Sequence, residues 1–230
     1  MGFQNYFERE YSSFWMKQVN VYGIDNAMSE ILELLKEKRP KSAYEVGIGT
    51  AWPIADSLYK EGIVVSGNDI SEKLINLALN KYPEMKLYVG DIADINLQGK
   101  YDLVYCIRTS WYIKDFRNAI RKMNSILSDD GALVFNVINK DNKDNNKGVL
   151  SSGIIKFLYR FYAALRVVIF NKDYIASPSP YYYRAKDIIK WLEEEKLNFK
   201  IYYEENDSIY NEDNLKAQKL LFYCWKRNAK

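Results

Sequence analysis

The sequence predicts an α/β protein in which a parallel sheet carries helices on both faces. Three observations support this fold class. Short apolar runs alternate with stretches of helical periodicity between residues 42 and 138, turn residues punctuate the junctions, and the runs are apolar almost throughout, as in strands buried on both faces. Strands that alternate with helices form a parallel sheet, because right-handed crossovers allow little else.

The first elements along the chain are a helix, a strand and a second helix. Residues 27–35 place their apolar side chains on one helical face, and Pro40 follows the end of that helix. The run at 42–49 is a strand that closes on glycines. Pro53 suits the first turn of the next helix, which Gly62 stops.

The same alternation continues to residue 138. Ser71 caps a helix after the second strand, and a helix over about 113–127 follows the fourth strand. The turn residues 128–131 then lead into the fifth strand. The second to fifth strands are expected at 63–69, 85–91, 101–107 and 132–138.

The alternation breaks after residue 138, where a polar loop begins. A helix is expected at 185–197, followed by strands at 199–206 and 215–227 that pair as an antiparallel hairpin. We expect one domain over residues 1–230, because no linker separates two cores. Its parts are an N-terminal cap or lid (1–40), a core (41–139), an insertion (140–183) and a closing helix with a β-hairpin (184–230).

Composition excludes several kinds of site. The net charge of +3 is too small for a protein that binds nucleic acid chiefly by neutralising phosphates. The sequence contains no histidine, which removes His-containing metal sites, Ser-His-Asp triads and any imidazole base.

Targeting signals and cysteines favour a cytoplasmic protein. The N-terminus lacks a secretory signal, and Cys106 and Cys224 lie in apolar runs that favour buried, reduced thiols. The apolar stretch at 153–170 carries three basic residues, so it is not expected to cross a bilayer.

The turn after the first strand is the most informative motif. It reads Glu45-Val-Gly47-Ile-Gly49, and open parallel sheets bind ligands beyond such strand ends. Asp69 ends the second strand, where a carboxylate can accept both hydroxyls of a ribose, and Asp91 ends the third. The pattern predicts a nucleotide-like ligand.

The residue at position 52 separates two classes of nucleotide. A nicotinamide-binding turn needs a very small residue there, so that the helix packs closely on the strand. Trp52 does not fit that contact, which disfavours a dehydrogenase.

On these motifs the chain resembles the class I S-adenosylmethionine-dependent methyltransferases, whose three-layer, Rossmann-like sheet has seven strands with the last antiparallel. The resemblance spans nearly the whole length, with Ala51 where a third glycine is usual. It implies that the cofactor is S-adenosylmethionine, the product S-adenosylhomocysteine (SAH), and that no metal is needed. By this resemblance the cofactor-binding residues are Glu45, Gly47, Gly49, Asp69, Ile70, Asp91, Ile92 and Ile107. Tyr11 and Trp15 join them if the aromatic N-terminal segment is a lid over the cofactor; the alternative is an amphipathic helix that caps the sheet.

The catalytic candidates lie after the fourth strand, where the resemblance places the transferred methyl group. Without histidine, any base must be Asp, Glu, Tyr or Lys. Asp115 is either such a base or a first-turn helix carboxylate. Arg108 is either a solvated strand end or a clamp on an acidic acceptor, and Tyr112 is either catalytic or a core residue.

The insertion supplies candidates for acceptor binding. Residues 154–170 read as a basic amphipathic helix, which either packs against the domain or a second subunit, or contacts an anionic membrane or a lipid-linked or phosphorylated acceptor. The return to the sheet carries aromatic rings that either pack or bind a sugar-like acceptor. These candidates are Tyr181, Tyr182, Tyr183 and Arg184.

The sequence as a whole therefore favours O- or N-methylation of a small-molecule acceptor such as a sugar or a lipid-linked or phosphorylated metabolite. The alternatives are a methyltransferase on RNA or protein, and a non-catalytic cofactor-binding module. No nucleic-acid partner is expected, and the chain is either a monomer or a homodimer.

Overall fold

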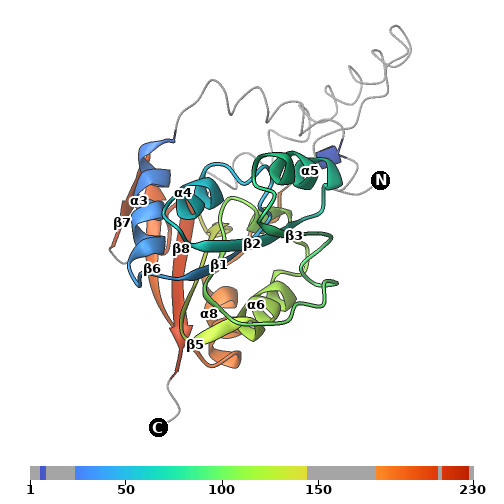
Figure 1. Cartoon of the computed structure of the whole chain (residues 1–230). Coiled ribbons are helices and arrows are strands. Elements are labelled where there is room, and N and C mark those ends of the chain that lie inside the picture. The colour runs from blue at the N-terminus through green and yellow to red at the C-terminus, as the bar shows by residue number, and fades with distance from the viewer. Residues whose placement is uncertain (1–5, 9–23, 144–179, 212–213, 228–230) are drawn as a thin grey trace, which may run out of the picture.

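A computed structural model describes residues 6–8, 24–143, 180–211 and 214–227 (Figure 1). Its sheet has eight strands in the order β3-β2-β1-β4-β5-β8-β6-β7. The expectations for Tyr11, Trp15 and the helix at 154–170 lie outside the described residues. The strands are β1 (Ser42–Val46), β2 (Val64–Asp69), β3 (Lys86–Val89), β4 (Tyr101–Cys106), β5 (Leu127–Ile138), β6 (Leu197–Glu205), β7 (Ser208–Tyr210) and β8 (Lys219–Lys226).

The predicted α/β fold is confirmed. Strands β1 to β5 pair in parallel. Strand β8 pairs antiparallel with β6, as predicted for the closing hairpin, and also with β5. The sheet holds one strand more than the seven that the resemblance implies. This strand, β7, pairs with the end of β6 after the turn at Asn206 and Asp207, where both residues have positive φ.

The turn predicted at 128–131 is wrong, because these residues lie inside β5. Leu127 pairs with Tyr101 and Ala132 pairs with Leu103 on the neighbouring strand. Strand β4 therefore advances from 101 to 103 while β5 advances from 127 to 132, and the extra residues form an irregularity in the strand pairing. Turn-forming residues here produce a local bulge without ending the strand.

Side-chain caps fix where several helices begin. The Asp25 carboxylate accepts from Met28 N, and the Ser71 hydroxyl accepts from Leu74 N, as N-cap residues do. Asp115 caps α6 in the same way, so this helix begins at Phe116, later than predicted. The helices are α3 (Asn26–Lys36), α4 (Ile54–Lys60), α5 (Glu72–Lys81), α6 (Phe116–Ser125) and α8 (Ala185–Glu194), with a 3₁₀ turn, η2 (Ser110–Tyr112), before α6.

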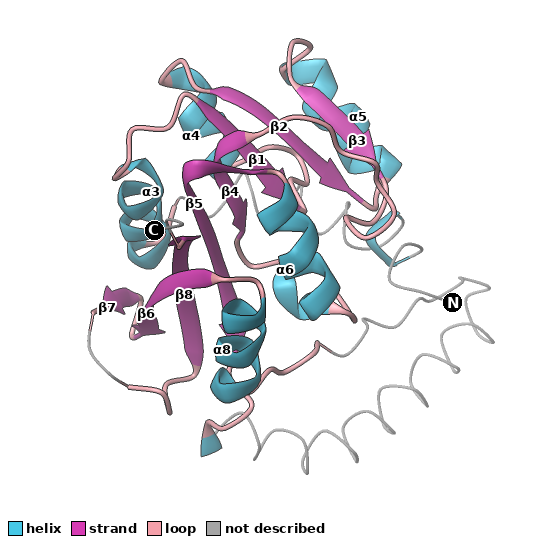
Figure 2. Cartoon of the chain, turned by 90° about the horizontal axis from the view of Figure 1, so that it is seen from below, coloured by secondary structure: helices cyan, strands magenta, loops and turns pink. Residues whose placement is uncertain are grey.

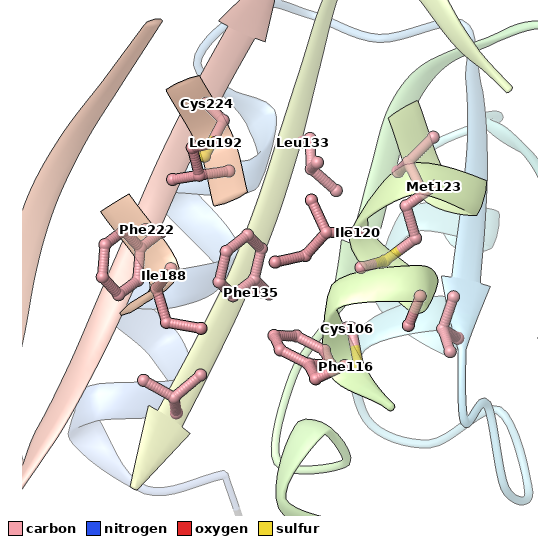
Figure 3. Close-up of a cluster of buried hydrophobic side chains, with 14 of the residues drawn as sticks. Cys106, Phe116, Ile120, Met123, Leu133, Phe135, Ile188, Leu192, Phe222 and Cys224 are labelled. Carbon is pink, nitrogen blue, oxygen red and sulfur yellow. The ribbon is translucent and has the colours of Figure 1, made fainter. Parts of the chain in front are cut away.

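Two apolar layers hold the helices on the sheet. Helices α3, α4 and α5 pack on one face, and α6 and α8 pack on the other (Figure 2). On the second face Phe135 stacks on Phe222 with ring centroids 5.3 Å apart, and Phe116 meets Phe135 edge to face (Figure 3). Alternate residues of each strand supply the two layers.

Both cysteines are free and fully buried, as expected from their apolar surroundings. Burial raises the pKa of both the Cys106 and the Cys224 thiol. Among the described residues, no helix combines the length and the apolar character that a bilayer crossing requires.

We expect Phe135→Ala to lower the free energy of unfolding by about 3 to 5 kcal/mol, because the ring is fully buried between two others. Urea denaturation measures this change. Val64→Ala is the control, since Val64 is 67% exposed, and it should stay within about 0.5 kcal/mol of the wild type. Equal losses in the two variants would contradict this description of the core.

Candidate functional site

A cavity of about 260 Å³ opens at the carboxyl ends of the parallel strands. Its walls come from the segments that follow β1, β2, β3 and β4 and from the N-terminus of α3. Ten residues singled out from the sequence line it together: Glu45, Gly47, Gly49, Asp69, Ile70, Asp91, Ile92, Ile107, Arg108 and Tyr112.

The glycine turn needs its glycines for two different reasons. Gly47 has φ +80°, and a Cβ there would lie 2.2 Å from Thr109 Cγ2, so no side chain fits. Gly49 has φ +56°, but a Cβ there would meet no described atom within 4 Å. The turn is thus tight against the segment after β4 at Gly47 and open at Gly49.

Asp69 holds the open part of this turn in place. Its Oδ2 accepts from Gly49 N at 2.9 Å, and its Oδ1 accepts from Ser71 N at 2.9 Å. Burial raises the pKa of the Asp69 carboxyl to about 6, although these backbone hydrogen bonds favour its charged form. Each oxygen has a second lone pair that can accept from a ligand.

Glu45 is buried beneath the same turn. The Tyr105 hydroxyl donates to Glu45 Oε2 at 3.0 Å. Burial raises the pKa of Glu45 to about 8, the Tyr105 hydrogen bond opposes this shift, and the nearby Asp69 charge adds to it. The carboxyl therefore carries a proton at neutral pH in the absence of a ligand.

Asp91 and Ile92 form the far end of the cavity. The Asp91 side chain is exposed and accepts from Ala93 N at 2.9 Å through one oxygen, whereas Ile92 is buried. This end therefore offers a carboxylate beside an apolar surface.

The opposite wall contains residues that the sequence analysis did not single out. Asp25 lines the cavity, and both its carboxylate oxygens pair with Arg108 Nη2, at 3.0 and 2.7 Å. Phe7 also lines it and packs edge to face on Tyr112, with ring centroids 5.0 Å apart. Phe7 belongs to the aromatic N-terminal segment, whereas Asp25 gave no signal because its partner Arg108 is far away in the sequence.

Five predicted residues do not line the cavity. The Asp115 carboxylate caps α6, and the Tyr183 hydroxyl donates to Ile113 O while its ring packs on Phe116. These positions favour the helix-cap and packing interpretations of Asp115 and Tyr183. Tyr181, Tyr182 and Arg184 also lie outside the cavity lining. Their roles in acceptor binding stay predictions.

The cavity has an excess of acidic groups. With Glu45 protonated, the carboxylates of Asp25, Asp69 and Asp91 line it, against Arg108 and Lys114. Such a surface favours a ligand with a positive charge. No group of three or more metal-ligating side chains occurs in the part of the chain that the structure describes.

Residues 20–203 match the family model described as a methyltransferase domain, and this match covers most of the chain. The chain belongs to the methyltransferase-domain family. The match confirms the resemblance drawn from the glycine turn and the acidic residues at the strand ends. It includes every residue named above as lining the cavity except Phe7.

Curated relatives match over part of their length. A ubiquinone biosynthesis O-methyltransferase of Coxiella burnetii is 28% identical over 108 residues, which are 45% of this chain and 46% of that protein. A dTDP-4-amino-2,3,4,6-tetradeoxy-D-glucose N,N-dimethyltransferase of Saccharopolyspora spinosa is 27% identical over 111 residues, 46% of this chain and 44% of that protein. The chain thus aligns with just under half the length of these relatives.

Solved structures share the whole fold. A magnesium protoporphyrin IX methyltransferase from Synechocystis, with bound SAH, superposes with a TM-score of 0.66 over 97% of both chains, at 15% sequence identity. At this identity the likeness establishes the fold alone.

We expect the ligand-free protein to lose stability as the pH rises from 5 to 8. Over the interval between the ordinary Glu value of 4.5 and about 8, the folded state keeps a proton on Glu45 that the unfolded chain has released. The free energy of unfolding therefore falls with pH, by at most about 1.4 kcal/mol per pH unit for this carboxyl.

Urea denaturation at pH 5, 6.5 and 8 measures this slope. Glu45→Gln should flatten the slope between pH 6.5 and 8, because the amide keeps an acceptor for the Tyr105 hydroxyl without titrating, whereas Asp69, with its pKa of about 6, still contributes at lower pH. Glu33→Gln, at a side chain that is 79% exposed, is the matched control and should keep the wild-type slope. An unchanged slope in Glu45→Gln would mean that this carboxyl does not titrate as described.

Proposed function

We propose that this chain is an S-adenosylmethionine-dependent methyltransferase that transfers a methyl group to an oxygen or nitrogen of a small molecule. The observation that carries the proposal is that one cavity brings together the glycine turn, Asp69 at the end of β2 and Asp91 after β3. The chain's membership of the methyltransferase-domain family supports the reaction class.

The residues present fit S-adenosylmethionine. Gly49 leaves open space where a side chain would stand, which suits the close approach of the methionine part. Asp69 has lone pairs available for the ribose hydroxyls, and Ile70 lies beside it in the cavity wall. Asp91 and Ile92 offer an acceptor and an apolar surface for the adenine.

The charge of the cavity supports a sulfonium cofactor. The acidic excess stabilises a cation, and the rings of Phe7 and Tyr112 add apolar and π surface to the wall. When bound, S-adenosylmethionine supplies a methyl group on a good leaving group. The protein must then align the acceptor and exclude water, and alignment alone can contribute about 7 to 11 kcal/mol.

A small acceptor is the choice that best fits the chain and its relatives. The net charge of +3 is small for a nucleic-acid enzyme, and two curated relatives have names that specify small molecules. One of these names specifies O-methylation and the other N,N-dimethylation, so the proposal includes both atoms.

We expect SAH at 100 times its Kd to stabilise the protein by about 2.7 kcal/mol through mass action. Asp69→Ala should weaken SAH binding ten- to a hundredfold, because hydrogen bonds to a charged group contribute about 1.5 to 3 kcal/mol. Isothermal titration calorimetry measures the affinity, and circular dichroism shows that the variant is folded.

Asp129→Ala is the matched control, because that carboxylate is 95% exposed and pairs with Lys226 away from the cavity lining. It should bind SAH as the wild type does. Stabilisation by NAD without any by SAH would refute the proposed cofactor, and full SAH affinity in Asp69→Ala would refute the assigned ribose site.

A further inference from the structure

The ion pair of Asp25 and Arg108 forms a prearranged polar wall of the cavity. The Asp25 carboxylate pairs with Arg108 Nη2 through both oxygens and also accepts from Met28 N at 2.8 Å. The two side chains are 38% and 33% exposed. They are therefore fixed by their partners and still reachable by a ligand.

The turn between β6 and β7 holds this wall in position. Asp207 accepts from Asn26 N at 3.2 Å, and the Asn26 side-chain amide donates to Asp207 O at 3.0 Å. Helix α3 consequently lies beside β7 at one edge of the sheet (Figure 1). Because Asp25 caps α3, these contacts also fix Asp25 opposite Arg108.

Unpartnered polar atoms gather behind the ion pair. Four buried side-chain polar atoms of the described residues lack a hydrogen-bond partner, and three of them are Arg108 Nε, Asn136 Nδ2 and Glu204 Oε2. Asn136 Oδ1 accepts from Arg108 N at 2.7 Å, and Glu204 Oε1 lies 3.7 Å from Arg108 Nη2. Asn136 and Glu204 are 2% and 7% exposed.

These buried atoms lie behind the wall, since Asn136 and Glu204 are not among the residues that line the cavity. Leaving a buried polar atom unpaired costs about 1 to 3 kcal/mol, and most such atoms in proteins have partners. Two of the three atoms carry N–H donors and one is a carboxylate oxygen. The groups that a ligand in the cavity can meet are the Asp25 carboxylate and the Arg108 guanidinium, and a group that both donates and accepts hydrogen bonds, such as a hydroxyl or an amine, complements this pair.

Charge decides between a neutral and an anionic acceptor. Arg108 pairs with Asp25, and the Lys219 ammonium donates to Glu204 on the same side of the network. Lys114, the other cation of the described cavity lining, is outnumbered by Asp69 and Asp91, so the lining has no excess positive charge for a carboxylate or phosphate ligand. The clamp on an acidic acceptor that the sequence allowed for Arg108 is therefore disfavoured.

We propose that Asp25 and Arg108 bind the methyl acceptor, and that the acceptor presents a hydroxyl or amine next to a second oxygen, as a vicinal diol or amino alcohol does. The reacting O–H or N–H donates to the Asp25 carboxylate, and the second oxygen accepts from the Arg108 guanidinium. This inference rests on the proposed function, because it names the acceptor class of the same cavity.

The proton balance of the step assigns Asp25 a catalytic role. The acceptor's electron pair forms the new bond to the methyl carbon, the carbon–sulfur bond breaks, and its electrons stay on sulfur as a neutral thioether. The O–H or N–H bond breaks, and the proton passes to Asp25 and then to water. Tyr112 suits this role less, because burial raises the pKa of its phenol.

Two N-cap aspartates allow a matched test. Asp25 and Asp115 each cap a helix, at α3 and α6, and only Asp25 lines the cavity. Asparagine caps helices about as well as aspartate, so Asp25→Asn and Asp115→Asn both keep the cap and remove the charge. Both variants should bind SAH with wild-type affinity.

Thermal shift of the SAH complex with a fixed set of compounds reads out acceptor binding. Catechol, methyl glucoside and a methyl glycoside of glucosamine are the neutral or amine members; benzoate and glucose 6-phosphate are the anionic ones. We expect at least one member of the first group to stabilise the wild type and Asp115→Asn but not Asp25→Asn. Stabilisation only by the anions, or by none of the five compounds, overturns the proposed class.

Methyl transfer to the compound that binds tests the catalytic part. We expect kcat of Asp25→Asn to fall 100-fold or more, because the variant has no carboxylate to take the proton. Arg108→Lys keeps a cation for Asp25 but loses the guanidinium, and should raise KM about tenfold with a smaller change in kcat. A kcat of Asp25→Asn equal to that of Asp115→Asn overturns the role of Asp25 as a base.

The two proposals fail in different ways. Loss of SAH binding in the wild type would refute the methyltransferase proposal itself. Normal SAH binding together with equal behaviour of Asp25→Asn and Asp115→Asn would refute only the acceptor site.

Discussion

The close approach of Gly47 to Thr109 is the constraint on which the site depends. No Cβ fits between them, so the turn after β1 lies directly against the segment after β4. Through this contact Asp69 and Arg108 line the same cavity. Ala51, at φ +67°, follows in the same turn and shows how far the backbone is held from its ordinary conformations. Few residue types can adopt a turn of this shape, so the glycines in the sequence indicate where the turn lies.

The buried carboxyls show a cost that the ligand-free protein bears at this site. Glu45 and Asp69 are both buried, and burial raises the pKa of each. A folded domain usually avoids such groups, because the charged form loses its water. Their position beneath a cavity that suits a cation gives the cost a functional reason.

Parts of the fold and site that depend on short-range patterns could be predicted from the sequence. Strand ends carry Asp69 and Asp91, and parallel strands bring their ends to one edge, so these residues were placed together correctly. Helix α6 begins about one turn later than predicted, because the periodicity of apolar residues does not show that Asp115 is the cap. Strand β7 is only three residues long and has no periodicity to detect.

Asp25 shows the other limit of sequence reasoning. Its carboxylate looks like an ordinary helix cap, and its second partner, Arg108, is 83 positions away. Such a pairing depends on where α3 lies on the sheet, and that position depends on β7. Asp25, on which the acceptor proposal rests, was thus the residue that the neighbouring sequence indicated least.

The strand β7 also has a consequence for the order in which the protein matures. The wall at Asp25 is completed by contacts from Asp207, 181 positions further along the chain from Asn26. During synthesis the glycine turn and its neighbouring strands can assemble well before residue 207 leaves the ribosome. A nascent chain would therefore form the turn at Gly47 and Gly49 before it could form the contacts that hold Asp25.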